Sequence, residues 1–166
     1  VKTQLFKQFG GFDEDFFAHM EEIDLCWRWQ SAGYKIFYTP KSKVFHIGGG
    51  TLSYDNPRKV YLNFRNGLFL LFKNLPSSKL FYIIWLRMLL DGIAGLKFLF
   101  SGSLNNFIGV LKAHVHFYLA TPSLIKKRNK ASVTFKKEKV MYLKSIVLSY
   151  YLKNKKKFSA LQQAGF

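Results

Sequence analysis

The chain has 166 residues, which is enough for one domain with a hydrophobic core but short for two. It carries 26 Lys and Arg residues against 9 Asp and Glu residues, and this net charge of +17 predicts an anionic partner, such as a phosphate-bearing ligand, a lipid head group or nucleic acid. The single cysteine, Cys26, excludes a scaffold held by internal disulfides and is typical of a cytosolic environment.

The N-terminal third predicts two helices separated by a loop. A helix over residues 2–9 ends at Gly10 and Gly11, because glycine reaches backbone angles that other residues resist. An aromatic-rich loop over 12–17 follows. Apolar residues at helical spacing then predict a helix over 21–32 with one buried stripe.

The next segment predicts two short strands and a long helix. Residues 35–38 and 44–47 are rich in β-branched and aromatic side chains and flank a turn near Pro40. A glycine-rich loop comes next, and a helix is predicted over residues 57–74.

Residues 79–100 form a mostly apolar stretch that is long enough to span a bilayer. Three charged residues, Arg87, Asp91 and Lys97, interrupt it, and each costs roughly 2.5–3.5 kcal/mol to insert at mid-membrane. On a helical projection the charges share one side and leave a wide apolar face that includes Trp85. This geometry favours a helix that lies in the membrane interface over one that crosses it.

The C-terminal part is amphipathic and strongly basic. A second amphipathic helix is indicated by a polar stripe, which consists of Asn105, Gly109, Lys112 and His116. Polybasic clusters follow at 126–130 and 153–157. Such clusters beside amphipathic helices predict binding to an anionic membrane surface.

The acidic residues are concentrated in one place. Six of the nine lie in a twelve-residue window: Asp13, Glu14, Asp15, Glu21, Glu22 and Asp24. In a basic protein, this clustering indicates that carboxylates handle a proton, a metal or hydroxyl groups. The alternative is that they are helix N-terminal charges favoured by the macrodipole.

The same window resembles a known family. Gly-Gly-Phe-Asp-Glu stands at 10–14, two aromatics at 16–17, Glu-Glu-Ile-Asp-Leu-Cys-Trp-Arg at 21–28, Gly-Tyr at 33–34, and a histidine at 46. This pattern resembles the C-terminal part of the catalytic domain in family 2 glycosyltransferases, especially bacterial rhamnosyltransferase-like members. The resemblance implies an α/β, Rossmann-like GT-A fold. We therefore expect residues 1–76 to be its acceptor-side part and 77–166 to be a helical, basic, membrane-associated region.

The resemblance also implies a function. We expect transfer of a sugar, with inversion, from a nucleotide-sugar donor to a lipid-linked or polysaccharide acceptor in cell-surface polysaccharide synthesis. The place would be the cytoplasmic face of the bacterial inner membrane, with peripheral attachment. A divalent metal, Mg²⁺ or Mn²⁺, is implied, with its main Asp-x-Asp ligands expected upstream of this chain, so the chain is not expected to turn over alone. Asp13-Glu14-Asp15 matches that spacing, but it follows a turn instead of a buried strand, and we interpret the match as coincidental.

Site residues follow from the resemblance position by position. The family's catalytic base is an Asp, and Glu22 stands at its place; Asp24 is the alternative base. His46 is expected to contact the metal or the diphosphate. The residues expected to bind substrate are Glu21, Phe17, Arg28 and Arg65, the last in an Arg-Asn pair that matches a weaker family element.

The competing hypothesis is a non-catalytic basic module that binds a membrane surface or nucleic acid. The high positive charge would support nucleic-acid binding. However, the basic residues alternate with long apolar stretches, and no helix-turn-helix, zinc or RNA-binding signature is present. We therefore expect no nucleic-acid partner.

Overall fold

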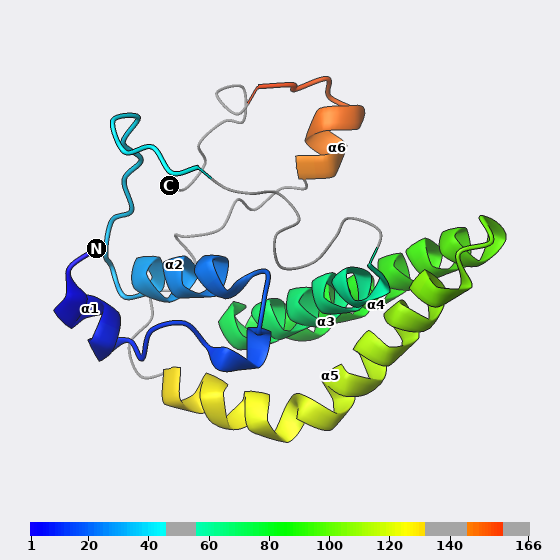
Figure 1. The fold of residues 1–166 in the computed structure, drawn as a ribbon, viewed down its shortest axis with the longest axis horizontal. Coiled ribbons are helices and arrows are strands. Elements are labelled where there is room, and N and C mark those ends of the chain that lie inside the picture. The colour runs from blue at the N-terminus through cyan, green and yellow to red at the C-terminus, as the bar shows by residue number, and fades with distance from the viewer. Residues whose placement is uncertain (46–55, 132–145, 158–166) are drawn as a thin grey trace.

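A computed structural model describes residues 1–45, 56–131 and 146–157 of the chain. Within these ranges every regular element is helical (Figure 1). The elements are α1 Thr3–Gln8, the short 3₁₀ helix η1 Glu14–Phe16, α2 Glu21–Ser31, α3 Pro57–Asn74, α4 Ser77–Phe100, α5 Leu104–Ala131 and α6 Ile146–Tyr151. The helices predicted over 2–9, 21–32, 57–74 and 79–100 all form, with small differences at their ends.

The predicted α/β, GT-A fold class is wrong, because the described residues contain helices and no strand. Residues 35–45 are irregular, and residues 46 and 47 of the second predicted strand lie outside the described ranges. A strand is stable only when its backbone N–H and C=O groups pair with a neighbour. In the described part of the chain no neighbouring strand lies beside 35–45, and Phe37 and Phe45 are 82% and 96% exposed. The β-branched and aromatic residues of this segment therefore predicted strands, but no partner strand is present in the described part of the chain to pair with them.

Helix α3 is the centre of the fold. It begins with a regular cap, in which the Asn56 side chain accepts a 2.9 Å hydrogen bond from the backbone N–H of Arg58 and Pro57 occupies the first turn. Its buried side chains pack against α5, α4, α2 and η1. The core cluster consists of Phe16, Leu68, Phe69, Leu70, Phe117 and Leu124. Burying each such side chain stabilises the fold by about 1.5–3 kcal/mol.

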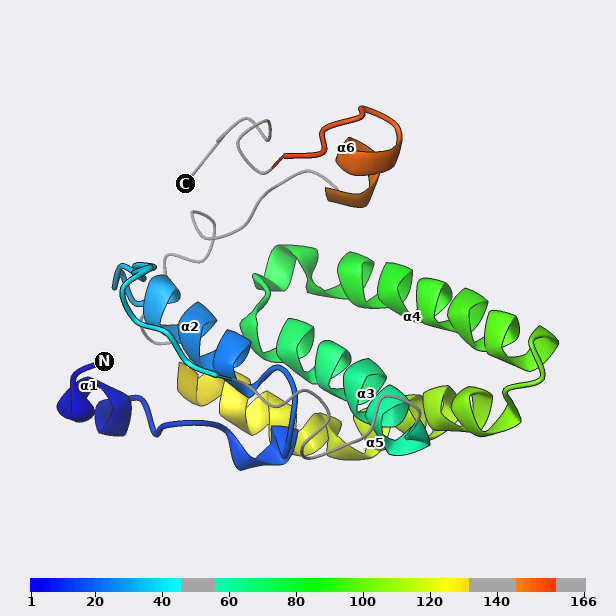
Figure 2. The same ribbon diagram turned by 45° about the horizontal axis from the view of Figure 1, so that its top comes forward.

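Helices α4 and α5 form an antiparallel hairpin beside α3 (Figure 2). Gly109 lies where α5 packs closely on α3, and a Cβ there would lie 3.4 Å from the carbonyl oxygen of Pro57, at the near limit of ordinary van der Waals contact. Helix α5 bends in its second half (Figure 1), where Pro122 removes a backbone donor and the Thr121 hydroxyl donates to the Phe117 carbonyl at 2.9 Å. The bend brings the C-terminal turns of α5 under the acidic loop.

Two sequence predictions concern the C-terminal region. None of the helices in the described ranges is apolar over enough of its length to cross a bilayer. The division at residue 76 stays a prediction. The core nevertheless draws on both sides of it, since Phe16 and Leu68 share one cluster with Phe117 and Leu124.

Candidate functional site

The acidic loop is folded by a glycine turn and an aromatic anchor. Gly10 and Gly11 both have positive φ, at 73° and 65°, and reverse the chain after α1. The Asp13 side chain then caps η1 by accepting a 3.1 Å hydrogen bond from the backbone N–H of Asp15. Phe16 is completely buried and packs edge-on against Phe69 of α3. This anchor fixes the carboxylates beside α3.

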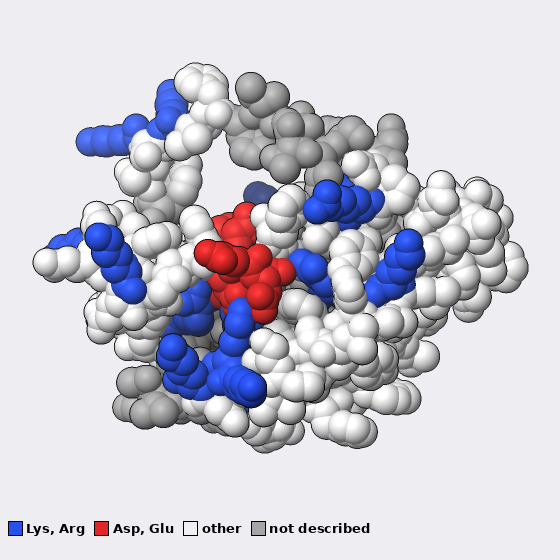
Figure 3. Space-filling view, turned by 60° about the horizontal axis from the view of Figure 1, so that its bottom comes forward, with Lys and Arg blue, Asp and Glu red and all other residues white. Residues whose placement is uncertain are grey.

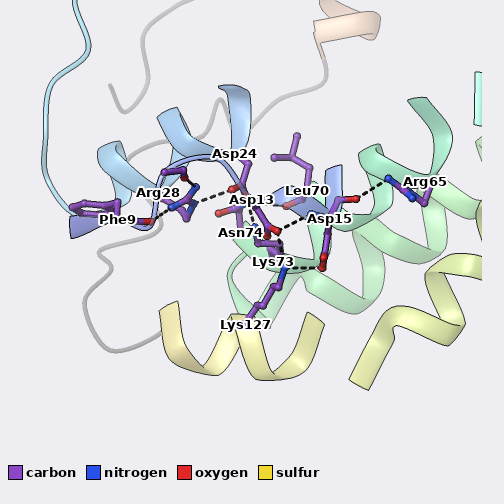
Figure 4. Close-up of polar contacts among 11 residues, drawn as sticks. Phe9, Asp13, Asp15, Asp24, Arg28, Arg65, Leu70, Lys73, Asn74 and Lys127 are labelled. Atoms are coloured by element: carbon purple, nitrogen blue, oxygen red, sulfur yellow. Dashed lines mark hydrogen bonds and ion pairs between the residues drawn. The ribbon is translucent and has the colours of Figure 1, made fainter. Parts of the chain in front are cut away.

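Two of these carboxylates are paired with lysines from distant parts of the chain. Asp13 contacts the ammonium groups of Lys73 and Lys127 at 2.5 and 2.6 Å, and Asp15 contacts Lys127 at 2.6 Å (Figure 4). Burial alone would raise the pKa of Asp13, but the hydrogen bonds from Lys127 and Lys73 outweigh it and hold that pKa at about 2. Although partial burial opposes it, the same pairing raises the pKa of Lys127. Asp13 and Asp15, which match the Asp-x-Asp spacing, therefore bind lysine ammonium groups in place of a divalent cation.

Asp24 is the most enclosed carboxylate of the cluster, with no exposed surface. One of its oxygens accepts from Arg28 Nε at 2.8 Å, and the other lies 2.9 Å from both Lys73 Nζ and Asn74 Nδ2 (Figure 4). A charge can be buried this deeply because it is paired and hydrogen-bonded. Asp24 thus links α2 to α3, and its carboxylate is not accessible to a substrate.

Arg28, predicted to bind substrate, is also engaged inside the protein. Besides Asp24, its guanidinium donates to the backbone carbonyls of Phe9 and Gly11, at 2.5 and 2.7 Å. A guanidinium offers several donors in a rigid planar fork, so one side chain can hold the glycine turn, α2 and Asp24 together. The geometry therefore favours a structural ion pair for Arg28 over contact with a substrate.

Glu22 lies one turn before Cys26 on the solvent-facing side of α2 and is exposed. Burial raises the pKa of the Cys26 thiol, and the negative charge of Glu22 raises it further. Glu21 is half-buried, and its Oε2 has no hydrogen-bond partner among the described residues. Glu22 is therefore the carboxylate of α2 that an acceptor in solution can reach.

The turn that leads into α2 is strained. Phe17, His19 and Met20 all have positive φ, at 61°, 70° and 76°, which costs of order 1–3 kcal/mol for each such residue. Asn66 of α3 holds this turn: its buried Nδ2 lies 2.9, 2.7 and 2.9 Å from the carbonyl oxygens of Phe16, Ala18 and His19. The surrounding fold therefore imposes the conformation that places Glu21 and Glu22.

Arg65 and Phe17, both predicted to bind substrate, flank the strained turn. Arg65 donates to the Asp15 carbonyl at 2.7 Å and to the Tyr61 hydroxyl at 3.2 Å, and that hydroxyl also contacts His116 Nδ1. Phe17 is 60% exposed, with the Arg58 guanidinium 4.6 Å from its ring centre. Arg65 thus supports the turn, while the Phe17 ring remains open to a ligand.

Seen from outside, the carboxylates form a single acidic patch bordered by lysine and arginine side chains (Figure 3). The predicted metal contact, His46, lies outside the described residues. In the described ranges no three His, Cys, Asp or Glu side chains are arranged to hold a metal ion. Of the predicted site residues in the described ranges, Glu22 and Phe17 are the exposed ones.

Comparison with known proteins gives one short match. A segment of 46 residues is 44% identical to the N-acetylglucosaminyl-diphospho-decaprenol L-rhamnosyltransferase of two Mycobacterium tuberculosis strains. The match covers 28% of this chain and 15% of the relative. No family model matches the chain, and no solved structure does. The similarity is to a glycosyltransferase over a short stretch, and it suggests a transferase.

Sequence reasoning missed the partners that neutralise the acids. Lys73 and Asn74 end α3, and Lys127 lies on α5, far along the chain from Asp13. A lysine at a helix C-terminus is ordinarily explained by the macrodipole. The sequence pattern therefore did not predict that Lys73 is buried beside Asp13. The Arg65-Asn66 pair was noticed only through the family resemblance, which gave it no structural role.

Proposed function

We propose that this chain supplies the acceptor side of an inverting glycosyltransferase that uses a nucleotide-sugar donor. Two observations support the proposal: the short match to a rhamnosyltransferase, and the position of Glu22 at the exposed start of α2. The relative is named for transfer of L-rhamnose to N-acetylglucosaminyl-diphospho-decaprenol. By analogy, we propose a rhamnose-like donor sugar and a lipid-linked acceptor for the whole protein.

In this proposal Glu22 is the general base. Its carboxylate accepts the proton of the acceptor hydroxyl as that oxygen attacks the anomeric carbon of the donor. The bond from this carbon to the phosphate oxygen breaks, and the nucleoside diphosphate leaves with the bonding electrons. Attack on the face opposite the leaving group inverts the anomeric configuration. Asp24 positions α2 and does not exchange protons with the substrate.

The neighbouring residues fit acceptor binding. The exposed ring of Phe17 offers an apolar face suited to the C–H surface of a sugar. Glu21 Oε2 is buried and has no hydrogen-bond partner among the described residues, so we assign acceptor contact to Glu22 and Phe17 and not to this oxygen. A divalent metal, when bound, would supply positive charge to the leaving diphosphate. The described carboxylates do not fit it, because lysines already occupy Asp13 and Asp15, and no step above depends on it.

Transfer is tested in the full-length polypeptide, since the chain spans only 15% of the relative's length. Glu22→Gln keeps the shape and removes the base, so we expect the transfer rate to fall by about 10²–10⁴-fold with donor binding unchanged. Glu14→Gln is the matched control, because Glu14 is an exposed acid of the same cluster and should keep its activity. Equal rates for Glu22→Gln and wild type would eliminate Glu22 as the base.

A further inference from the structure

The outer face of the α4–α5 hairpin is apolar, and no other part of the described chain covers it. At about 100° per residue, six large apolar side chains of α4 fall within an arc of about 120°: Phe81, Trp85, Leu89, Ile93, Leu96 and Phe100. All are exposed, and Phe81 and Phe100 reach 84%. On α5, Leu104, Ile108, Leu111, Val115 and Leu119 form a similar exposed stripe. Monomeric soluble proteins rarely expose contiguous apolar surface of this size.

The N-terminal part of the α4 stripe lies beside α5. A groove of about 490 Å³ runs between the helices, and its lining includes Phe81 and Trp85 of α4 together with Tyr118 of α5. The Tyr118 hydroxyl also contacts the sulfur of Met88 across the hairpin at 3.3 Å. In Figure 2, α4 lies along α3 at the edge of the helix assembly.

The polarity of α4 is the reverse of that of an ordinary surface helix. Its acid, Asp91, is 3% exposed and faces the neighbouring helices, where it accepts from Arg87 at 2.6 Å and lies 3.3 Å from His114 of α5. A helix at a protein–water boundary buries its apolar stripe and exposes its charges. Here the carboxylate is enclosed and the apolar stripe is outside, which suits a helix whose outer side contacts hydrocarbon.

The charge around this face selects the partner. Residues 77–131 carry eight Lys or Arg side chains against one acid, the enclosed Asp91; of the eight, Arg87 pairs with Asp91, Lys127 pairs with Asp13 and Asp15, and Arg128 is buried. Lys97 and Lys112 are exposed and lie at the edges of the two stripes. Trp85 and Tyr82 add the aromatic side chains that favour the level of lipid head groups. A second copy of this chain would bring the same lysines against each other, whereas an anionic bilayer attracts them.

We propose that the exposed face of the α4–α5 hairpin docks onto an anionic phospholipid bilayer, with the hairpin lying in the interface. The apolar stripes enter the boundary between head groups and acyl chains, and Lys97 and Lys112 contact lipid phosphates. Asp13 and Asp15 do not offset this positive charge, since they pair with Lys73 and Lys127. This inference does not depend on transferase activity.

The test measures sedimentation of the 166-residue chain with vesicles of phosphatidylglycerol and phosphatidylethanolamine. The triple variant Trp85→Gln, Leu89→Gln, Ile93→Gln should bind these vesicles at least ~30-fold more weakly than wild type, because three large apolar side chains are lost from the interface. The matched control is Phe37→Gln, Tyr38→Gln, Val44→Gln, which removes three apolar side chains outside the hairpin that are even more exposed and should bind like wild type. Circular dichroism establishes that each variant is helical.

A second variant keeps the apolar face and changes only the charge. Lys97→Glu with Lys112→Glu should weaken binding to the anionic vesicles by about tenfold or more. Phosphatidylcholine vesicles should bind the wild-type chain more weakly than the anionic ones, and added salt should narrow the difference. Equal binding of the triple hairpin variant and wild type would overturn the proposal. Equal binding to neutral and anionic vesicles, or a stable dimer that fails to bind vesicles, would overturn it as well.

Discussion

Replacing Asp24 by Asn separates a structural carboxylate from a catalytic one. The substitution keeps the size of the side chain but removes a charge that has no exposed surface and contacts Arg28, Lys73 and Asn74. Lys73 and Arg28 lose a close counter-charge, although Lys73 keeps Asp13. Breaking a buried ion pair from one side costs about 3–5 kcal/mol. Because a domain of this size is stable by only about 5–15 kcal/mol, we expect a large loss.

The assay is urea unfolding of the chain, followed by its helical circular dichroism signal. Glu22→Gln is the control on the same helix, and its exposed position predicts a change within about 0.5 kcal/mol. Asn74→Ala removes only a neutral donor to Asp24 and should cost about 1–3 kcal/mol. If Asp24→Asn unfolds at the same urea concentration as wild type, the ion-pair network does not stabilise the fold and our reasoning about Asp24 is wrong.

Two further predictions concern the turn and the acidic loop. Asn66→Ala removes the amide donor that holds three carbonyl oxygens of the strained turn, so we expect the free energy of unfolding to fall by about 2–4 kcal/mol, measured by urea unfolding. Hydrogen exchange at residues 17–20 should become faster. Asn66→Asp, whose carboxylate cannot donate a hydrogen bond, should not restore stability. The pKa of Asp13 is lowered from 3.8 to about 2, so its contribution is present above pH 3.8 and is lost as the pH falls towards 2. That contribution is about 2 kcal/mol at most, because the pair is partly open to solvent, and Asp13→Asn should flatten the fall in stability over this pH range. An unchanged pH profile in Asp13→Asn would show that other carboxylates cause the fall.

The helices and the existence of the acidic cluster were determined by the sequence itself. The helix predicted over residues 57–74 matches α3, because the periodicity of apolar positions is a local property. The gathering of acids between Asp13 and Asp24 was equally visible, and so was the apolar face of residues 79–100. These features depend on neighbours within a few positions along the chain.

Tertiary structure alone decided what those residues contact. It placed Lys73 and Lys127 on Asp13, enclosed Asp24, and left Glu22 exposed, although all three carboxylates look alike in the sequence. It also turned Asp91 towards α5 and left 35–45 without a strand partner. Such outcomes depend on groups far along the chain, 23 positions apart for Asp91 and His114 and 50 for Asp24 and Asn74. A local pattern shows that a charge or an apolar stripe exists, but only packing determines which surface it faces.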